Sequence, residues 1–249
     1  MSSIGPASTA LRLLLAVMAL SLMTACASTP PTPKEQVYDP LEPMNRSVYA
    51  FNQRLDRYVA APLARGYVRV TPEFMRDSVT NFFRNARYPG TIVNGAFQGK
   101  WGQSGRDTGR FLINSTAGLL GLFDVAQHVG LERNEEDFGK TLAGWGVSEG
   151  AHLEIPALGP SNTRDVHDIP VSAVTNLTIY LGGWTVVLPL YVLDAVNTRA
   201  RLDTAARFRS EAALDEYVFT RGAYRSYRNN VIFEGSPPEV DPFDELEDW

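Results

Sequence analysis

An uncharged, largely apolar stretch, Ala173–Leu193, places the strongest limit on how this chain can fold. Its 21 residues must be buried in a protein core or placed in a membrane, since most of their side chains cannot form hydrogen bonds with water. Asn176, the pair Gly182-Gly183 and Pro189 interrupt the stretch and disfavour one continuous helix. The pattern therefore predicts two apolar half-helices joined at the glycine pair, and it leaves both a core position and a membrane position open.

Each half of this stretch is too short to cross a bilayer. Halves of about 8–10 residues rise 1.5 Å per residue and cannot reach across a hydrocarbon core of about 30 Å. We therefore expect the halves to lie in the plane of a membrane leaflet, with their side chains shared between acyl chains and the protein interior. The candidates for this membrane-embedded or lipid-path role are Leu177, Ile179, Leu181, Trp184, Val187, Leu188 and Leu190.

The N-terminus has the features of an export signal. A basic residue, Arg12, precedes the apolar run Leu13–Leu22, and small residues lead to the only cysteine of the chain, Cys26. This ending resembles the lipobox of bacterial lipoproteins, with Met23 where leucine is usual. We predict that residues 1–25 are a lipoprotein signal peptide and that Cys26 carries covalent lipid; the alternative is an incidental thiol. Because the chain has a single cysteine, an intramolecular disulfide is excluded.

Both ends of the mature chain differ in composition from its middle. Residues 26–37 are polar and proline-rich, which is typical of an extended tether. Residues 234–249 hold seven acidic and no basic side chains, and we expect a disordered tail. The tail carries a charge of −7 and thus accounts for all of the net charge of −5, so the body, residues 38–233, is near neutral and unsuited to general nucleic-acid binding.

The spacing of apolar residues in the body predicts a mainly helical fold with little sheet. Asp39-Pro40-Leu41-Glu42 has the capping residue, proline and glutamate of a helix start, and Thr71-Pro72-Glu73 opens a second helix that should end near Tyr88-Pro89-Gly90. Alternation within Gly144–Pro160 predicts a short strand or hairpin. Further helices are expected at Ile92–Phe97, Arg106–Ser115, Val187–Arg207 and Glu211–Arg228.

The residues offer no support for catalysis. Gly102-Gln103-Ser104-Gly105 lacks the final glycine of a nucleophile elbow, so Ser104 is expected in a turn or helix cap. Gly95–Lys100 is one residue too short for a phosphate-binding loop. No carboxylate–histidine cluster has metal-ligand spacing, and His128 and His152 are expected to be exposed or half-buried. We therefore predict no enzyme, no metal and no cofactor apart from the lipid on Cys26.

Arginine outnumbers lysine by 20 to 3, and seven arginines crowd into residues 199–228 among three tyrosines. Guanidinium groups bind phosphate in a two-pronged way, so this face could meet lipid phosphates or an acidic partner. The interpretation we favour is a solvated helix face, with counter-charges at Asp203, Glu211, Asp215 and Glu216.

Motifs spread over residues 38–230 resemble the MlaA (VacJ) family of phospholipid-transport lipoproteins. The resemblance begins with Asp39-Pro40-Leu41-Glu42, Asn45-Arg46, Tyr49 and Phe51-Asn52. It continues through Asn81-Phe82, Val93-Asn94, Gln98-Gly99, Arg110–Ser115, Gly118–Asp124, Asp137–Leu142, Gly144–Val147, Leu158–Ser161 and Arg164-Asp165. It ends with Thr198-Arg199-Ala200, Tyr217, Arg221 and Tyr224.

The resemblance implies a ring-like helical body with an amphipathic channel, set in the inner leaflet of the outer membrane. It also implies a function: such proteins take mislocalised phospholipid from the outer leaflet and pass it to a periplasmic lipid carrier, often beside a trimeric porin. Ala27 agrees with this location, since it is not the aspartate that resembles an inner-membrane retention signal. The alternatives are a structural envelope lipoprotein without transport activity and a lipid hydrolase, which would need a nucleophile that the residues do not supply.

Overall fold

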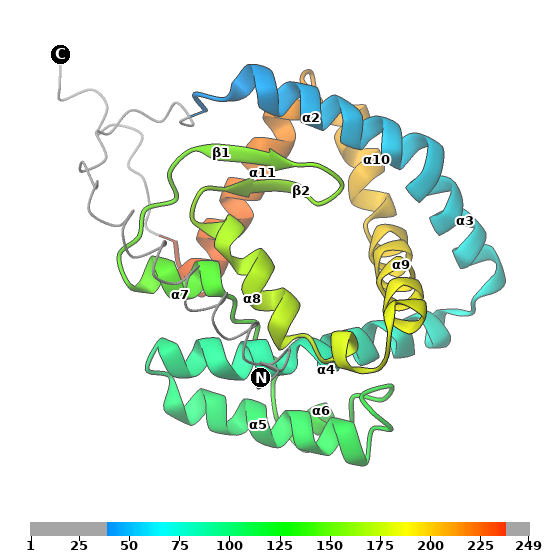
Figure 1. Cartoon of the computed structure of the whole chain (residues 1–249), viewed down its shortest axis with the longest axis vertical. Coiled ribbons are helices and arrows are strands. Elements are labelled where there is room, and N and C mark those ends of the chain that lie inside the picture. Colours follow the sequence, from blue (N-terminus) through cyan, green and yellow to red (C-terminus); the bar gives the residue numbers. More distant parts are fainter. Residues whose placement is uncertain (1–38, 238–249) are drawn as a thin grey trace, which may run out of the picture. The chain divides into compact units, whose positions relative to one another are not determined.

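Helices follow one another around a ring in residues 39–237, the part of the chain that this computed structural model describes (Figure 1). The predicted signal peptide, the tether with Cys26, and residues 238–249 of the predicted tail lie outside the described residues. The elements are α2 (Glu42–Leu55), η1 (Asp56–Ala60), α3 (Ala61–Val70), α4 (Glu73–Phe97), α5 (Trp101–Thr116), α6 (Val125–His128), α7 (Phe138–Gly144), β1 (His152–Ile155), β2 (Gly159–Asn162), η2 (Asp165–His167), α8 (Asp168–Thr175), η3 (Leu177–Tyr180), α9 (Trp184–Arg201), α10 (Asp203–Ala212) and α11 (Glu216–Ile232). The prediction of a mainly helical fold with little sheet is confirmed.

One arc of the ring is a continuous run of helix, α2–η1–α3. The middle piece, η1, is a π-helical turn in which the N–H of Ala61 bonds to the carbonyl of Asp56. The predicted start of α2 is confirmed, but the predicted cap is wrong: Leu41 is the N-cap residue, and no side chain caps the helix there. The carboxylate of Asp39 is instead used to close the ring, as described below.

The longest helix, α4, continues across a position where the sequence predicted a break. It continues through Pro89 to Phe97 and absorbs the separately predicted helix Ile92–Phe97. A proline in a helix interior removes one backbone hydrogen bond, but the flanking Tyr88 and Gly90 are buried as α4 packs against α5 and α8. A Cβ at Gly90 would lie 2.8 Å from the Thr175 hydroxyl of α8, so the glycine permits this close approach. Burial on both sides holds the helix together across the proline.

The predicted hairpin is confirmed. Strands β1 and β2 pair antiparallel, with Leu153 opposite Ser161 and Ile155 opposite Gly159. Asn45 of α2 fixes the hairpin against the ring: its Nδ2 donates to the carbonyl of His152 (2.9 Å), and its Oδ1 accepts from the N–H of Glu154 (2.9 Å). His152 is 5 % exposed, so the expectation that it would be exposed or half-buried is wrong.

The expected helix Val187–Arg207 is divided at Leu202 into α9 and α10. Asp203 lies at the break, and its carboxylate accepts hydrogen bonds from Arg199 and Arg207, one on each side. The last helix, α11, begins at Glu216, five residues later than expected, because Asp215 caps it by accepting from the N–H groups of Tyr217 and Val218.

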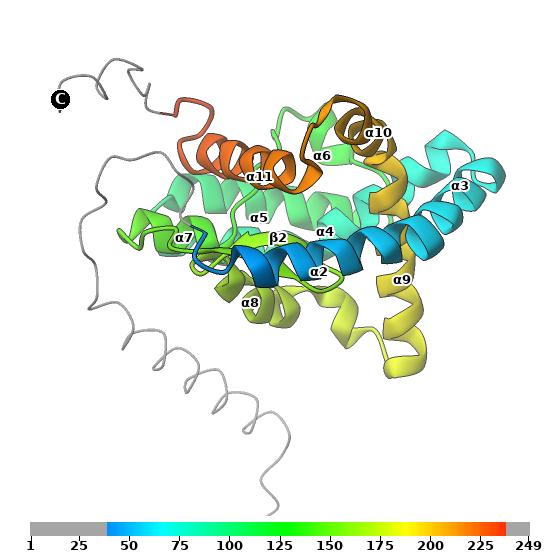
Figure 2. The ribbon, with the colours of Figure 1, turned by 90° about the horizontal axis from the view of Figure 1, so that it is seen from above.

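The stretch Ala173–Leu193 is broken at Asn176 and at Gly182-Gly183, as predicted, but the predicted interruption at Pro189 is wrong, because this proline lies inside the 18-residue helix α9. Helix α8 ends at Thr175, a short 3₁₀ turn η3 follows, and α9 begins directly after Gly182-Gly183. Within the described residues, no single helix is long and apolar enough to cross a membrane; the bent pair Asp165–Tyr180 and Trp184–Arg201, meeting at 116°, passes that test only when combined. Figure 2 shows this turn projecting from one face of the ring, with α10 and α11 on the opposite face.

The ring is closed where its first and last helices meet. The buried carboxylate of Asp39 pairs with Arg221 of α11 (2.7 Å) and also accepts hydrogen bonds from Asn45 (2.8 Å) and the Tyr217 hydroxyl. Burial acts to raise the pKa of Asp39, but these hydrogen bonds outweigh it and hold the pKa below its ordinary value. Asp39 therefore joins the start of the described chain to α11.

A second buried carboxylate, Asp165, joins α11 to the hairpin and to α7. It accepts from Arg164 (2.8 Å), Asn162 (2.9 Å) and the Tyr224 hydroxyl (2.8 Å). Arg228 lies 2.8 Å from Asp165 through Nε and pairs with Asp137, the cap of α7, at 2.7 Å. A Cβ at Gly139 would lie 2.5 Å from Asp165, so glycine leaves room for this network.

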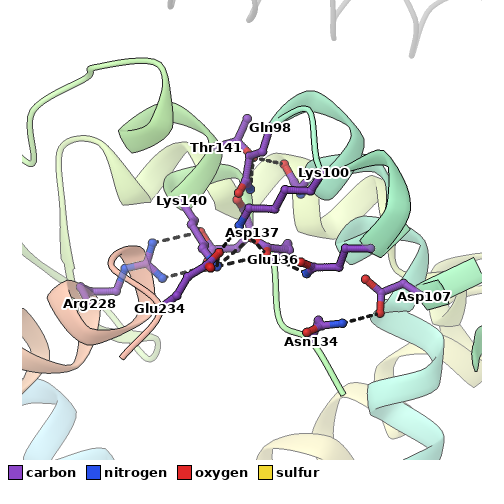
Figure 3. Close-up of polar contacts among 12 residues, drawn as sticks. Gln98, Lys100, Asp107, Asn134, Glu136, Asp137, Lys140, Thr141, Arg228 and Glu234 are labelled. Carbon is purple, nitrogen blue, oxygen red and sulfur yellow. Dashed lines mark hydrogen bonds and ion pairs between the residues drawn. The ribbon is translucent and has the colours of Figure 1, made fainter. Parts of the chain in front are cut away.

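The first residue of the predicted tail contacts the helical body. Figure 3 shows Glu234 beside Lys100 and Lys140, and both lysines also reach the buried Glu136 at 3.0 Å. Two positive charges thus lie between two carboxylates at the end of α11. This cluster gives Glu234 a structural contact that its place in an acidic tail did not suggest.

Candidate functional site

A charged cavity of about 680 Å³ lies inside the ring, between the α2–η1–α3 arc and helices α9, α10 and α11. Its residues from the arc follow helical spacing, from Gln53 through Ala61 and Ala64 to Val68. The π-helical turn η1 presents the neighbours Asp56 and Arg57 to the same cavity. The charged lining consists of Asp56, Arg57, Arg65, Arg76, Arg199, Asp203, Arg207, Arg209 and Glu216. We call this cavity the polar compartment.

A second cavity of about 570 Å³ adjoins it, between α2, the hairpin and helices α9–α11. It also has polar side chains in its wall, including Asn52, Glu154 and Thr220. Most of its remaining lining is apolar: Tyr49, Leu55, Ala60, Ala157, Leu158, Pro160, Ala195, Leu202, Ala205, Phe219 and Ala223. We call this cavity the apolar compartment.

The two compartments share part of their walls. Gln53, Asp56, Arg199, Ala206 and Arg209 line both. Two contacts cross between the arc and the opposite helices here: Arg199 donates to Asp56 (3.1 Å), and Arg209 donates to Gln53 (3.1 Å). The compartments therefore meet at a partition. The two contacts that cross it are both between side chains.

The arginines of residues 199–228 have acidic counterparts, as our favoured interpretation predicted, though mostly different ones. They do not form the predicted solvated helix face, because the side chains of Arg199, Arg221 and Arg228 are largely buried. Of the four predicted carboxylates, Asp203 and Glu216 pair with members of this group, whereas Asp215 pairs with Arg46. The pairs are Arg199–Asp56, Arg201–Asp77, Arg207–Asp203, Arg209–Glu216, Arg221–Asp39, Arg225–Glu149 and Arg228–Asp137. Most of these pairs hold helices together.

The candidate lipid-path residues gather at the projecting turn and line neither compartment. Trp184 is 82 % exposed and Leu188 60 %, and Leu177 and Leu181 are also exposed. Ile179 and Leu190 are half-buried, whereas Val187 is buried. The residues predicted from the sequence thus form an exposed apolar corner, and the prediction did not identify the compartments.

The lining of the compartments had a partial signal in the sequence. Positions 53, 57, 61, 64 and 68 share one helical face, on which the polar Gln53 and Arg57 are followed by Ala61, Ala64 and Val68. Such a face is too polar for a core and too rich in alanine for an ordinary solvent-exposed face. Its partner, the break between α9 and α10, could not be located without the structure.

The structure brings no catalytic group together at Ser104. This serine is buried in the interior of α5, so the predicted turn or cap position is wrong, and it packs against Gly95 of α4. A nucleophile elbow needs a sharp strand-to-helix turn that exposes the serine. Among residues 39–237, no three His, Cys, Asp or Glu side chains are grouped so as to hold a metal ion.

Comparison with known proteins decides the family. The sequence profile described as MlaA lipoprotein matches residues 37–231, most of the chain. The chain belongs to the MlaA lipoprotein family.

Relatives within reach of sequence comparison agree with the MlaA assignment. The chain is 32 % identical to the intermembrane phospholipid transport system lipoprotein MlaA of Escherichia coli K12, over 93 % of each protein. It is 43 % identical to an uncharacterised protein of Rickettsia prowazekii, over 58 % of this chain and about half (56 %) of that protein.

A solved structure is similar as well. A chain from work on the structural basis for maintenance of bacterial outer membrane lipid asymmetry matches with a TM-score of 0.69 and 29 % identity. The match covers 78 % of this chain and 98 % of the solved chain.

Some of the MlaA motif residues make the contacts that close the ring. Asp39, Asn45, Tyr217 and Arg221 form the first junction. Asp137, Gly139, Asp165 and Tyr224 belong to the second. Other motif residues line the apolar compartment, and Arg199 is the one that also reaches the partition. These lining residues are Tyr49, Asn52, Leu158, Gly159, Pro160, Thr198 and Arg199.

Proposed function

We propose that this chain is an outer-membrane lipoprotein that takes mislocalised phospholipid from the outer leaflet through its ring and passes it to a periplasmic carrier. This activity would maintain the lipid asymmetry of the outer membrane, in company with a trimeric porin. The observation that carries the proposal is the pair of adjoining compartments inside the ring, one charged and one largely apolar. The name of the Escherichia coli relative, an intermembrane phospholipid transport system lipoprotein, supports it.

The physical need for such a cavity follows from the substrate. Two acyl chains contain about 30 CH₂ groups, so moving a phospholipid into water costs on the order of 20 kcal/mol. An apolar wall for the chains beside a charged wall for the headgroup keeps both parts solvated along the path. Direction then comes from the downstream carrier, and the chain needs no catalytic residue or cofactor of its own.

The proposed position in the membrane uses the exposed apolar corner. Helix α9 runs from Trp184 at this corner to Arg199 at the partition, a rise of about 22 Å at 1.5 Å per residue. With the corner among acyl chains of the inner leaflet, the arginines reach the level of the headgroups or the periplasm. Lipid on Cys26 would anchor the protein to the same leaflet.

Deletion of the gene tests the function. We expect phospholipid to accumulate in the outer leaflet and the cells to become sensitive to detergent, and the intact gene should reverse both effects. An unchanged lipid distribution would favour a structural envelope lipoprotein. If a Ser104→Ala protein restores transport, the hydrolase alternative loses its candidate nucleophile.

A charge at the apolar corner should weaken membrane binding. We expect Leu188→Asp to reduce the vesicle binding of anchor-free protein by roughly 30- to 150-fold, since a carboxylate in the acyl region costs about 2–3 kcal/mol. Leu214→Asp is the matched control, because Leu214 is also exposed but lies in the connection between α10 and α11, the helices on the opposite face (Figure 2). Flotation with vesicles measures both variants, and equal losses would contradict the proposed orientation.

The in-plane position of the corner has its own test. A cysteine at Gly182 or Gly183, with Cys26 as the only native thiol, can be probed on whole cells with an impermeant reagent. We expect no labelling from the cell exterior. Strong labelling would mean that the segment crosses the membrane.

A further inference from the structure

We propose that Arg57, Arg65 and Arg76 form a phosphate subsite in the polar compartment that selects phospholipids with a net negative headgroup over zwitterionic ones. This inference rests on the proposed function, and it adds a substrate preference to it. It is carried by the charge balance of the compartment and by the apolar compartment that adjoins it.

The charges of the polar compartment divide into two sets. Three arginines are neutralised by the three carboxylates of the lining: Arg199 by Asp56 and Asp203, Arg207 by Asp203, and Arg209 by Glu216. Within residues 39–237, the other three, Arg57, Arg65 and Arg76, form no ion pair and donate no side-chain hydrogen bond. The compartment therefore holds about three uncompensated positive charges.

The three free arginines come from three elements that converge on one cavity. Arg57 lies in η1 and Arg65 two turns later in α3, whereas Arg76 lies in the first turns of α4. The Nε of Arg76 is buried and has no hydrogen-bond partner in the described part of the chain. A buried donor without an acceptor costs stability unless a ligand or water satisfies it.

Guanidinium groups that have no ion-pair partner favour a phosphate-bearing ligand. The planar donors of arginine match the oxygens of a phosphate two at a time. A zwitterionic headgroup brings its own cation into the compartment, where it meets the excess positive charge, whereas an anionic headgroup does not. The adjoining apolar compartment provides a place for acyl chains. Free phosphate has no acyl chains, so this compartment favours a phospholipid as the ligand.

A lipid-competition experiment tests the preference. Full-length lipidated protein in non-ionic detergent would be equilibrated with equal amounts of phosphatidylglycerol and phosphatidylcholine of the same chains. Native mass spectrometry then gives the ratio of the two bound lipids. We expect about fivefold enrichment of the anionic lipid, the size of effect that one partly solvated charge produces.

Two triple variants with equal changes in charge separate the subsite from net charge. Arg57→Gln, Arg65→Gln and Arg76→Gln together should bring the ratio close to one and leave total bound lipid nearly unchanged. Arg54→Gln, Arg69→Gln and Arg106→Gln remove three exposed arginines that line neither compartment, and the enrichment should persist. An unchanged ratio in the first variant, or an equal loss in both, would overturn the inference.

Competition with inorganic phosphate distinguishes a lipid ligand from a free anion. Inorganic phosphate at millimolar concentration should not displace the bound lipid; full displacement would assign the subsite to a soluble anion and overturn the lipid preference. If the native protein binds both lipids equally, only this inference fails. If it binds no phospholipid, the proposed function fails with it.

Discussion

Replacing Arg228 by methionine should lower the free energy of unfolding by about 3–5 kcal/mol, the usual cost of removing one partner from a buried ion pair. Arg228 is 7 % exposed and is the cation next to both Asp137 and Asp165. Without it, the buried Asp165 keeps only Arg164 as a cationic neighbour within ion-pair distance in the described residues. Guanidinium unfolding of detergent-solubilised protein, followed by circular dichroism, measures the change.

Arg225→Met is the control for this prediction. Arg225 lies one turn earlier on α11 and pairs with Glu149 at 3.0 Å, but about a third of each side chain is exposed. Exposed pairs contribute about 0–1 kcal/mol, so this variant should remain close to the native stability. Equal losses in the two variants would show that Arg228 is not a special junction of the ring.

A Cys26→Ala protein should lose its membrane anchor almost completely. If Cys26 carries a diacylglycerol and a further acyl chain, three long chains at about 0.8 kcal/mol per CH₂ make release from the membrane negligible. Without the cysteine, we expect an unprocessed precursor or a mislocalised protein that takes up no labelled fatty acid. Normal outer-membrane fractionation together with normal acyl labelling would refute the assignment of Cys26.

The local features of the fold could be predicted because they depend on neighbouring residues. Proline and glutamate after Asp39 mark the start of α2, and alternation marks the hairpin that β1 and β2 form. The glycine pair before Trp184 marks the break in the apolar stretch. In each case the decisive interaction lies within a few positions of the signal.

The features that could not be predicted depend on distant contacts. Pro89 stays within α4 because burial against α5 and α8 outweighs one lost hydrogen bond. Asp39 has the sequence position of a helix cap, but Tyr217 and Arg221, far along the chain, use its carboxylate. A local pattern does not show which of two possible partners a carboxylate will have.

The candidate site shows the same division. The apolar corner at Trp184 and Leu188 was recognisable because it is continuous in sequence. The compartments were not, because their walls come from the α2–η1–α3 arc and from helices more than 100 positions later. The motifs that indicate the MlaA family did not reveal them either, since the motif residues in the walls, such as Tyr49, Asn52 and Leu158, lie far apart in the sequence.

Blocking the junction between the two compartments tests most directly whether phospholipid passes through the ring. Ala206 lines both compartments, so Ala206→Trp should fill the junction, whereas Ala212→Trp places the same ring on an exposed position of the same helix. The measurement is the labelling of outer-leaflet phospholipid on whole cells by an impermeant amine reagent, at equal levels of outer-membrane protein. We predict that Ala206→Trp accumulates outer-leaflet phospholipid as strongly as the deletion strain and that Ala212→Trp does not; a normal lipid distribution in the Ala206→Trp strain would contradict passage through this cavity.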